Sequence, residues 1–116
     1  MAKIKLAARA ATVAGSALLL LGVAAAPAYA ATLSTTGAKG RYEYFKNGTY
    51  QMWLTDTLSD GHCAQWQEKA SGGSWTWVGE RNCSSGEINA VWLGRLGYQI
   101  RICRTGVGNC STAVKL

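Results

Sequence analysis

The sequence predicts an all-β fold: a small antiparallel β-sandwich or partly closed barrel of about seven short strands, stapled by two disulfides. Three observations predict it. Short segments of alternating polar and apolar residues are separated by turn signals about every ten residues. No segment carries a sustained helical period, and 14 glycines are too many for long helices. The chain also has an even number of cysteines, at Cys63, Cys83, Cys103 and Cys110.

The first 30 residues have the pattern of a secretory signal peptide. Three basic residues precede an apolar run over 10–26, and residues 28–30 (Ala-Tyr-Ala) match a small-residue cleavage site. Cleavage after Ala30 removes 3 of the 12 basic residues and none of the 6 acidic ones, which leaves a formal charge of +3. That charge is too small to indicate nucleic acid or a membrane as the partner. We therefore expect a secreted, extracellular monomer that does not contact the membrane after cleavage.

The remaining chain divides into a short arm and one domain. Residues 31–40 are small and polar and predict a flexible N-terminal arm, and residues 41–116 form a single β domain. Asn47-Gly48 lies between two aromatic runs and predicts a type I′ hairpin turn. We expect the strands to follow one another in a meander-like order. They are predicted at 41–45, 49–57, 63–69, 74–83, 88–93, 98–103 and 110–116.

The cysteines predict disulfides, not a zinc site. There is no Cys-x-x-Cys pair, and His62 is the only histidine. Cys63 and Cys83 are equidistant from the turn at 71–74, and Cys103 and Cys110 bracket a glycine-rich loop. Residues opposite one another in a hairpin have the separation that a disulfide needs. The predicted pairs are Cys63–Cys83 and Cys103–Cys110.

The sequence offers little that indicates catalysis. His62 is the only imidazole, it lies in a predicted turn beside Asp60, and no nucleophile-elbow motif is present. The six acidic residues are scattered, and no phosphate-binding, calcium-binding or dinucleotide-binding motif occurs. We therefore expect a binding protein and not an enzyme, with no cofactor and no metal.

Aromatic residues supply one set of candidate binding residues: Tyr42, Tyr44 and Trp53. Coplanar exposed rings suit the apolar faces of sugars. The sequence leaves open whether Tyr42 and Tyr44 face solvent or the core. Trp75 and Trp77 share one strand face, and the residues between and beside them are more polar, so we expect these two tryptophans to face the core.

The loop between Cys103 and Cys110 supplies the second set: Arg104 and Thr105. A disulfide-closed loop that exposes Arg104 is suited to enter the pocket of a protease, because a pre-organised loop costs less to bind. Two alternatives stay open. Arg81, Arg95, Arg101 and Arg104 form a modest basic patch for an acidic partner, or they are scattered solubilising charges.

The segment 54–64, with its Asp-Thr-x-x-Asp-Gly-x-Cys pattern, and the later run 98–103 resemble small exported proteins of actinobacteria. The alanine-rich signal is similar as well. The resemblance implies export and a β-rich fold, and it implies no activity. In size and disulfide number the chain is also similar to the small secreted amylase inhibitors of that group, although their Trp-Arg-Tyr triplet is absent and the cysteine spacing differs.

These patterns together predict a secreted, non-enzymatic binding protein whose partner is an extracellular protein or a polysaccharide. The first hypothesis is an inhibitor of an extracellular hydrolase that acts through the Arg104 loop. The alternative is a cell-wall or polysaccharide-binding module that uses exposed aromatic rings. An antimicrobial or toxin-like protein is less favoured at a charge of +3.

Overall fold

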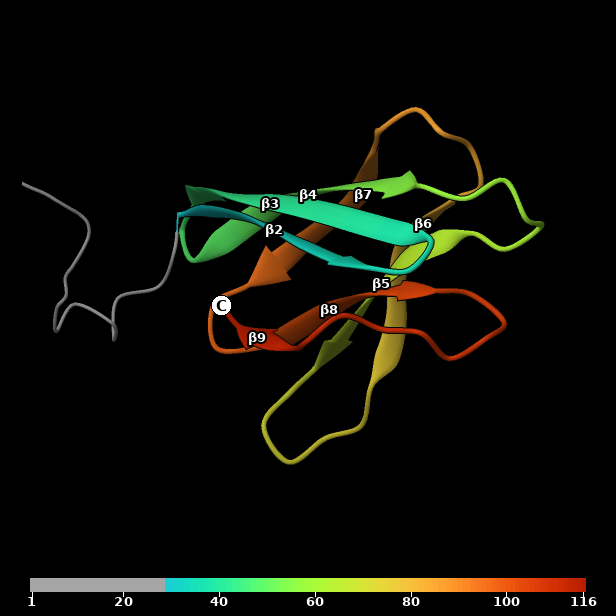
Figure 1. Cartoon of the computed structure of the whole chain (residues 1–116). Coiled ribbons are helices and arrows are strands. Elements are labelled where there is room, and N and C mark those ends of the chain that lie inside the picture. Colours follow the sequence, from blue (N-terminus) through green and yellow to red (C-terminus); the bar gives the residue numbers. More distant parts are fainter. Residues whose placement is uncertain (1–28) are drawn as a thin grey trace, which may run out of the picture.

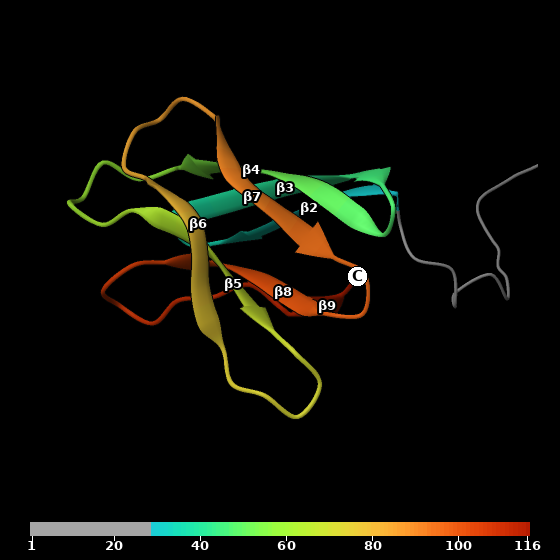
Figure 2. The same ribbon diagram turned by 180° about the vertical axis from the view of Figure 1, so that it is seen from behind.

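A computed structural model describes residues 29–116 as two antiparallel sheets packed face to face, which confirms the predicted all-β class (Figure 1, Figure 2). The first sheet has the order β2 (Ala30–Thr35), β3 (Ala38–Lys46), β4 (Thr49–Asp56), β7 (Ile88–Arg95). The second has the order β6 (Thr76–Asn82), β5 (Ala64–Lys69), β8 (Gln99–Arg104), β9 (Val114–Lys115). The predicted signal peptide falls mainly on residues 1–28, which lie outside the described residues. Residues 29–116 hold no helix of the length and apolar character that a membrane span requires.

The predicted N-terminal arm at 31–40 is wrong. This segment forms β2 and the start of β3, which pair in an antiparallel hairpin around Gly37. Ala31 and Leu33 pack against the core, and Ala38 is fully buried. Small side chains are needed here because the second sheet lies close: a Cβ on Gly40 would come within 2.3 Å of the Trp66 ring. The small residues that suggested an arm are thus required by close packing.

The meander-like strand order is also wrong. After β4 the chain crosses to the second sheet for the β5–β6 hairpin, returns to place β7 beside β4, and crosses again to place β8 beside β5. Pairs such as β4–β7 and β5–β8 are distant in sequence. They form because two packed sheets bury the apolar face of each, which a single open meander of short strands does not achieve.

The first hairpin turn agrees with its prediction. Asn47 and Gly48 have φ angles of 54° and 73°, so both central residues occupy the left-handed region that a type I′ turn requires. Tyr44 is paired with Tyr50 across this hairpin, and their rings meet edge to face with centroids 5.4 Å apart. The turn therefore sets the register that directs Tyr50, Met52 and Leu54 inward.

The core lies between the sheets and is centred on Trp66. Its indole ring is fully buried, and its Nε1 donates a hydrogen bond of 3.2 Å to the backbone oxygen of Trp53 in the opposite sheet. Asn82 makes a second bond of this kind, from its side-chain amide to the Leu54 oxygen at 2.7 Å. Ile100 and Ile102 face this core, as their alternation predicts. Two buried polar side chains therefore fix how the sheets are placed relative to one another.

Both disulfides form as predicted, and both lie in the second sheet. Cys63 and Cys83 flank the open end of the β5–β6 hairpin with Cα atoms 4.3 Å apart. Cys103 and Cys110 form a cross-strand pair with Cα atoms 4.0 Å apart and close the β8–β9 loop. Neither bridge joins the two sheets, so contact between the sheets depends on the core, on the buried hydrogen bonds and on an ion pair between Arg95 of β7 and Glu68 of β5.

Candidate functional site

The outer face of the second sheet carries the most exposed tryptophan in the described chain. Trp77 on β6 is 43% exposed, and Trp75, just before β6, is half-buried. The prediction that these two residues face the core is therefore wrong. Val78 points inward instead and packs against the core. Asn82, four residues further along, is buried as well, and between these two residues the register of β6 against β5 shifts, where Gly79 has a φ of 72°.

Strand register identifies the neighbours of Trp77. Trp77 is opposite Gln67 on β5, and Gln67 is opposite Arg101 on β8, so one row of side chains crosses three strands. Arg101 donates a hydrogen bond of 2.8 Å from Nε to the Gln67 side-chain oxygen. Its guanidinium also lies 4.1 Å from the centre of the Trp75 ring. One polar contact and one cation–π contact thus fix Arg101 on this face.

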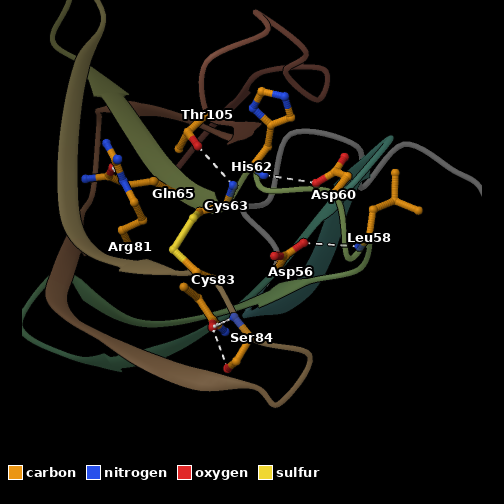
Figure 3. Close-up of a disulfide and its surroundings, with 11 residues drawn as sticks. Asp56, Leu58, Asp60, His62, Cys63, Gln65, Arg81, Cys83, Ser84 and Thr105 are labelled. Atoms are coloured by element: carbon orange, nitrogen blue, oxygen red, sulfur yellow. Dashed lines mark hydrogen bonds between the residues drawn. A yellow bond between two sulfur atoms is a disulfide. The ribbon is translucent and has the colours of Figure 1, made fainter.

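The rows on either side of Gln67 extend the same face. Towards the Cys63–Cys83 bridge, Arg81 donates a bond of 3.2 Å to the Gln65 side-chain oxygen, and Figure 3 shows these two side chains lying together. Towards the hairpin turn, Lys69, Gln99 and Lys115 form the next row. We call this surface the Trp77 face; it comprises Gln65, Gln67, Lys69, Trp75, Trp77, Arg81, Gln99, Arg101 and Lys115.

The β5–β6 hairpin is the part of the second sheet that projects furthest. In both views its turn lies beyond β8 and β9, on the side away from the first sheet (Figure 1, Figure 2). Along β5, the four steps from Gln65 to Lys69 span about 13 Å at the usual rise of a strand. A face of this length, carried on a hydrogen-bonded sheet, is suited to an extended ligand.

The β8–β9 loop is held tightly, and its two predicted binding residues are not free. Thr105 is 8% exposed; its hydroxyl accepts a bond of 2.9 Å from the Cys63 amide, and its own amide donates one of 2.8 Å to the Cys63 oxygen. Figure 3 shows the first of these contacts beside the disulfide (Figure 3). Thr105 therefore joins the loop to the start of β5 and is not available to a ligand.

Arg104 does not project into solvent as the inhibitor hypothesis requires. Its side chain is 19% exposed, forms an ion pair with Asp60 and donates a bond of 3.2 Å to the Asn109 side-chain oxygen. Its methylene groups lie so close to Gly37 that a Cβ there would be 2.5 Å away. The exposed part of the loop is instead its tip, where Val107 is 43% exposed between two glycines.

The three aromatic candidates on the first sheet are not gathered on one surface. Tyr42 is 5% exposed and lies edge to face with Trp66, so it belongs to the core, and burial raises its pKa. Trp53 is half-buried beneath the Arg41 guanidinium, which lies 4.0 Å from its ring centre. Tyr44 is 37% exposed and lines a shallow cavity of about 240 Å³ with Tyr29, Tyr50 and Leu96.

Three of the six acidic residues form ion pairs with arginine side chains. Arg41 pairs with Glu87 at 2.9 Å, Arg95 with Glu68 at 2.6 Å, and Arg104 with Asp60. The hydrogen bond from Arg41 lowers the pKa of Glu87, and the one from Arg104 lowers the pKa of Asp60. The predicted basic patch is thus divided. Arg95 and Arg104 are paired elsewhere, and only Arg81 and Arg101 share a face.

Other candidate sites are less developed. A second cavity of about 330 Å³ lies beside the Cys63–Cys83 bridge and is lined by small polar residues of the 56–59 and 83–85 segments. Within residues 29–116, no three His, Cys, Asp or Glu side chains come together as a metal site would require. His62 is half-buried against Gly106, and its backbone amide donates to Asp60 at 3.1 Å.

Comparison with family models, curated proteins and solved structures found no match to this chain. The functional argument therefore rests on the geometry described above. Of that geometry, the sequence missed the Trp77 face because alternation alone does not show which side of a strand is buried. One signal for this face was present in the sequence: Trp75 and Trp77 are two residues apart and closely follow a glycine-containing turn.

Proposed function

We propose that this is an exported, non-enzymatic binding protein that binds polysaccharides on the Trp77 face. The observation that carries the proposal is the 43% exposure of Trp77 in a row with Arg101, whose guanidinium is held by the buried side chain of Gln67 between them. An indole ring offers an apolar plane to the CH face of a sugar, and a guanidinium group in the same row donates to sugar hydroxyls. A row of this kind supplies both contacts at once.

The rigidity of the second sheet supports this role. Both disulfides lie in it, and β5 is hydrogen-bonded on both sides, to β6 and β8. Arg101 is already fixed by Gln67 and Trp75 before any ligand arrives. Side chains held in place in this way lose little conformational entropy on binding, so more of the contact energy is realised as affinity.

Export is part of the same proposal. Two disulfides are consistent with an oxidising compartment outside the cytosol. The signal-like pattern of residues 1–30 and the resemblance to small exported actinobacterial proteins support secretion. Cell-wall and environmental polysaccharides are abundant ligands in that compartment, and we therefore place the protein among binding modules.

The proposal is tested by replacing Trp77. We expect Trp77→Ala to weaken binding to a retained polysaccharide about tenfold, because truncation of a central aromatic contact commonly costs more than 1 kcal/mol. The measurement is affinity electrophoresis of the oxidised protein through gels that contain soluble cellulose, chitin, mannan or pectin derivatives. Circular dichroism checks that the variant is folded.

Phe45→Ala is the matched control, because Phe45 is 46% exposed on the first sheet and Trp77 is 43% exposed on the second. The control is expected to leave the affinity unchanged. Equal losses in both variants, or no retardation of the wild type by any of the gels, would contradict the proposal.

The inhibitor hypothesis is the second candidate, favoured by one observation: the double hydrogen bond between Thr105 and Cys63 holds the disulfide-closed loop in one conformation. In this version Val107 at the tip, and not Arg104, enters the enzyme. We expect Val107→Asp to abolish inhibition in a screen of extracellular hydrolases while the fold is kept. A variant as potent as the wild type would refute this use of the loop.

A further inference from the structure

The charges of the described chain are unevenly distributed. Three of its basic residues, Arg41, Arg95 and Arg104, form ion pairs with acidic side chains. Four others lie on the Trp77 face, and within residues 29–116 none of these four forms an ion pair: Lys69, Arg81, Arg101 and Lys115. The outward positions of β5, β8 and β9 include no acidic residue, and on β6 the exposed acidic residue is Glu80, next to Arg81. The Trp77 face therefore carries four basic residues, with Glu80 as the acidic residue on its edge strand.

The basic groups are placed around the exposed ring and not at random. Arg101 is two strands from Trp77 in the same row, and Lys69 reaches the Trp75 ring, with its ammonium 5.8 Å from the ring centre. Arg81 lies one row away on the same strand as Trp77. Successive rows on a strand are about 7 Å apart, so an extended ligand meets a positive charge at regular intervals.

From this distribution we infer that the ligand is an anionic polysaccharide, with carboxylate groups repeated along its chain. The inference rests on the proposed function and specifies its substrate class. The rings contact the sugar planes, and the lysine and arginine groups contact the carboxylates, with Arg101 positioned for bidentate binding. An anionic ligand also offsets the mutual repulsion of four like charges on one face, which a neutral glycan does not do.

Single-stranded nucleic acid is the other polymer that combines flat surfaces, its bases, with repeated negative charge. The polysaccharide is favoured by the two disulfides, which are consistent with an extracellular location where such glycans occur. It is also favoured by the side-chain amide of Gln99 on this face, which suits the hydroxyl groups of a sugar.

The experiment compares matched glycans that differ only in charge. The pairs are polygalacturonate with its methyl ester, and carboxymethylcellulose with hydroxyethylcellulose. We expect the wild type to bind the acidic member of at least one pair more tightly. We also expect this preference to fade as the NaCl concentration rises from 0.05 to about 1 M, where the screening length falls to about 3 Å.

Two double variants of equal charge test the location. Lys69→Gln with Lys115→Gln removes two charges from the Trp77 face, and Lys39→Gln with Lys46→Gln removes two from the first sheet. All four lysines are exposed or partly exposed. We expect the first variant to lose about fivefold in affinity for the acidic glycan, and the second to change little.

The possible outcomes separate the two proposals. If both double variants weaken binding equally, or if the methyl ester binds as well as the acid at every salt concentration, the inference of an anionic ligand is overturned. In that case, loss of binding in Trp77→Ala would still support the proposal that the Trp77 face binds polysaccharides. Tighter binding to poly(dT) than to either acidic glycan overturns the choice of polymer. If the wild type binds none of the glycans, both proposals are overturned.

Discussion

At the scale of single residues, glycine decides whether the two sheets can approach. Gly40 on β3 faces the Trp66 ring so closely that a Cβ would lie 2.3 Å from Cζ2. The neighbour is a fully buried indole in the centre of the core, and its Nε1 is fixed by a hydrogen bond to Trp53. The ring therefore has little freedom to move away, and Gly40 is required by packing.

We accordingly expect Gly40→Ala to lower the free energy of unfolding by about 1 to 3 kcal/mol, the usual cost of an overpacked core. Urea denaturation followed by tryptophan fluorescence measures the change. Gly86→Ala is the matched control, because nothing lies within 4 Å of the position its Cβ would take. If Gly40→Ala lowers the free energy of unfolding no more than Gly86→Ala does, the sheets can move apart to admit the added Cβ at little cost.

At the scale of elements, the β8–β9 loop and the β4–β5 loop are joined by the ion pair between Arg104 and Asp60. The hydrogen bond from Arg104 is the largest influence on Asp60, and it lowers the pKa of this carboxyl group below its ordinary value of 3.8. A carboxyl group with a lowered pKa in the folded state binds fewer protons than in the unfolded chain. Its contribution is therefore present above 3.8 and is lost as the pH falls through the folded-state pKa.

Thermal melts as a function of pH test this link between the loops. We expect Asp60→Asn to melt below the wild type at neutral pH, and the two melting curves to converge as the pH falls below 3.8. Glu80→Gln serves as the control, since Glu80 forms none of the ion pairs described for residues 29–116. A melting difference for Asp60→Asn that is the same at every pH would show that the carboxylate does not stabilise the loops through its charge.

At the scale of the whole molecule, the two sheets have different roles. The first sheet contributes one wall of the core and carries no disulfide. The second sheet carries both disulfides and the Trp77 face. Because the bridges brace only the sheet that bears the exposed tryptophan, the covalent constraint acts where a binding surface needs rigidity. Burial, hydrogen bonds and an ion pair hold the other sheet.

The sequence by itself determined those features that depend on neighbours along the chain. The Asn47-Gly48 turn, the alternation of Ile100 and Ile102 and both disulfide pairs follow from local patterns, because a hairpin brings residues together at fixed spacing. The all-β class follows from the same patterns. Each of these was predictable because no distant segment is needed to specify it.

Only the tertiary structure decided what depends on segments far apart in sequence. Whether Trp77 or Val78 faces the core was settled by the packing of Val78 against the core between the two sheets. Arg104 does not project into solvent because its side chain is held by Asp60, 44 residues away in the sequence. The concentration of charge on the Trp77 face arises because β5, β8 and β9 are neighbours in one sheet. Net charge and alternation are both read along the sequence, and neither contains information on which strands are paired in a sheet.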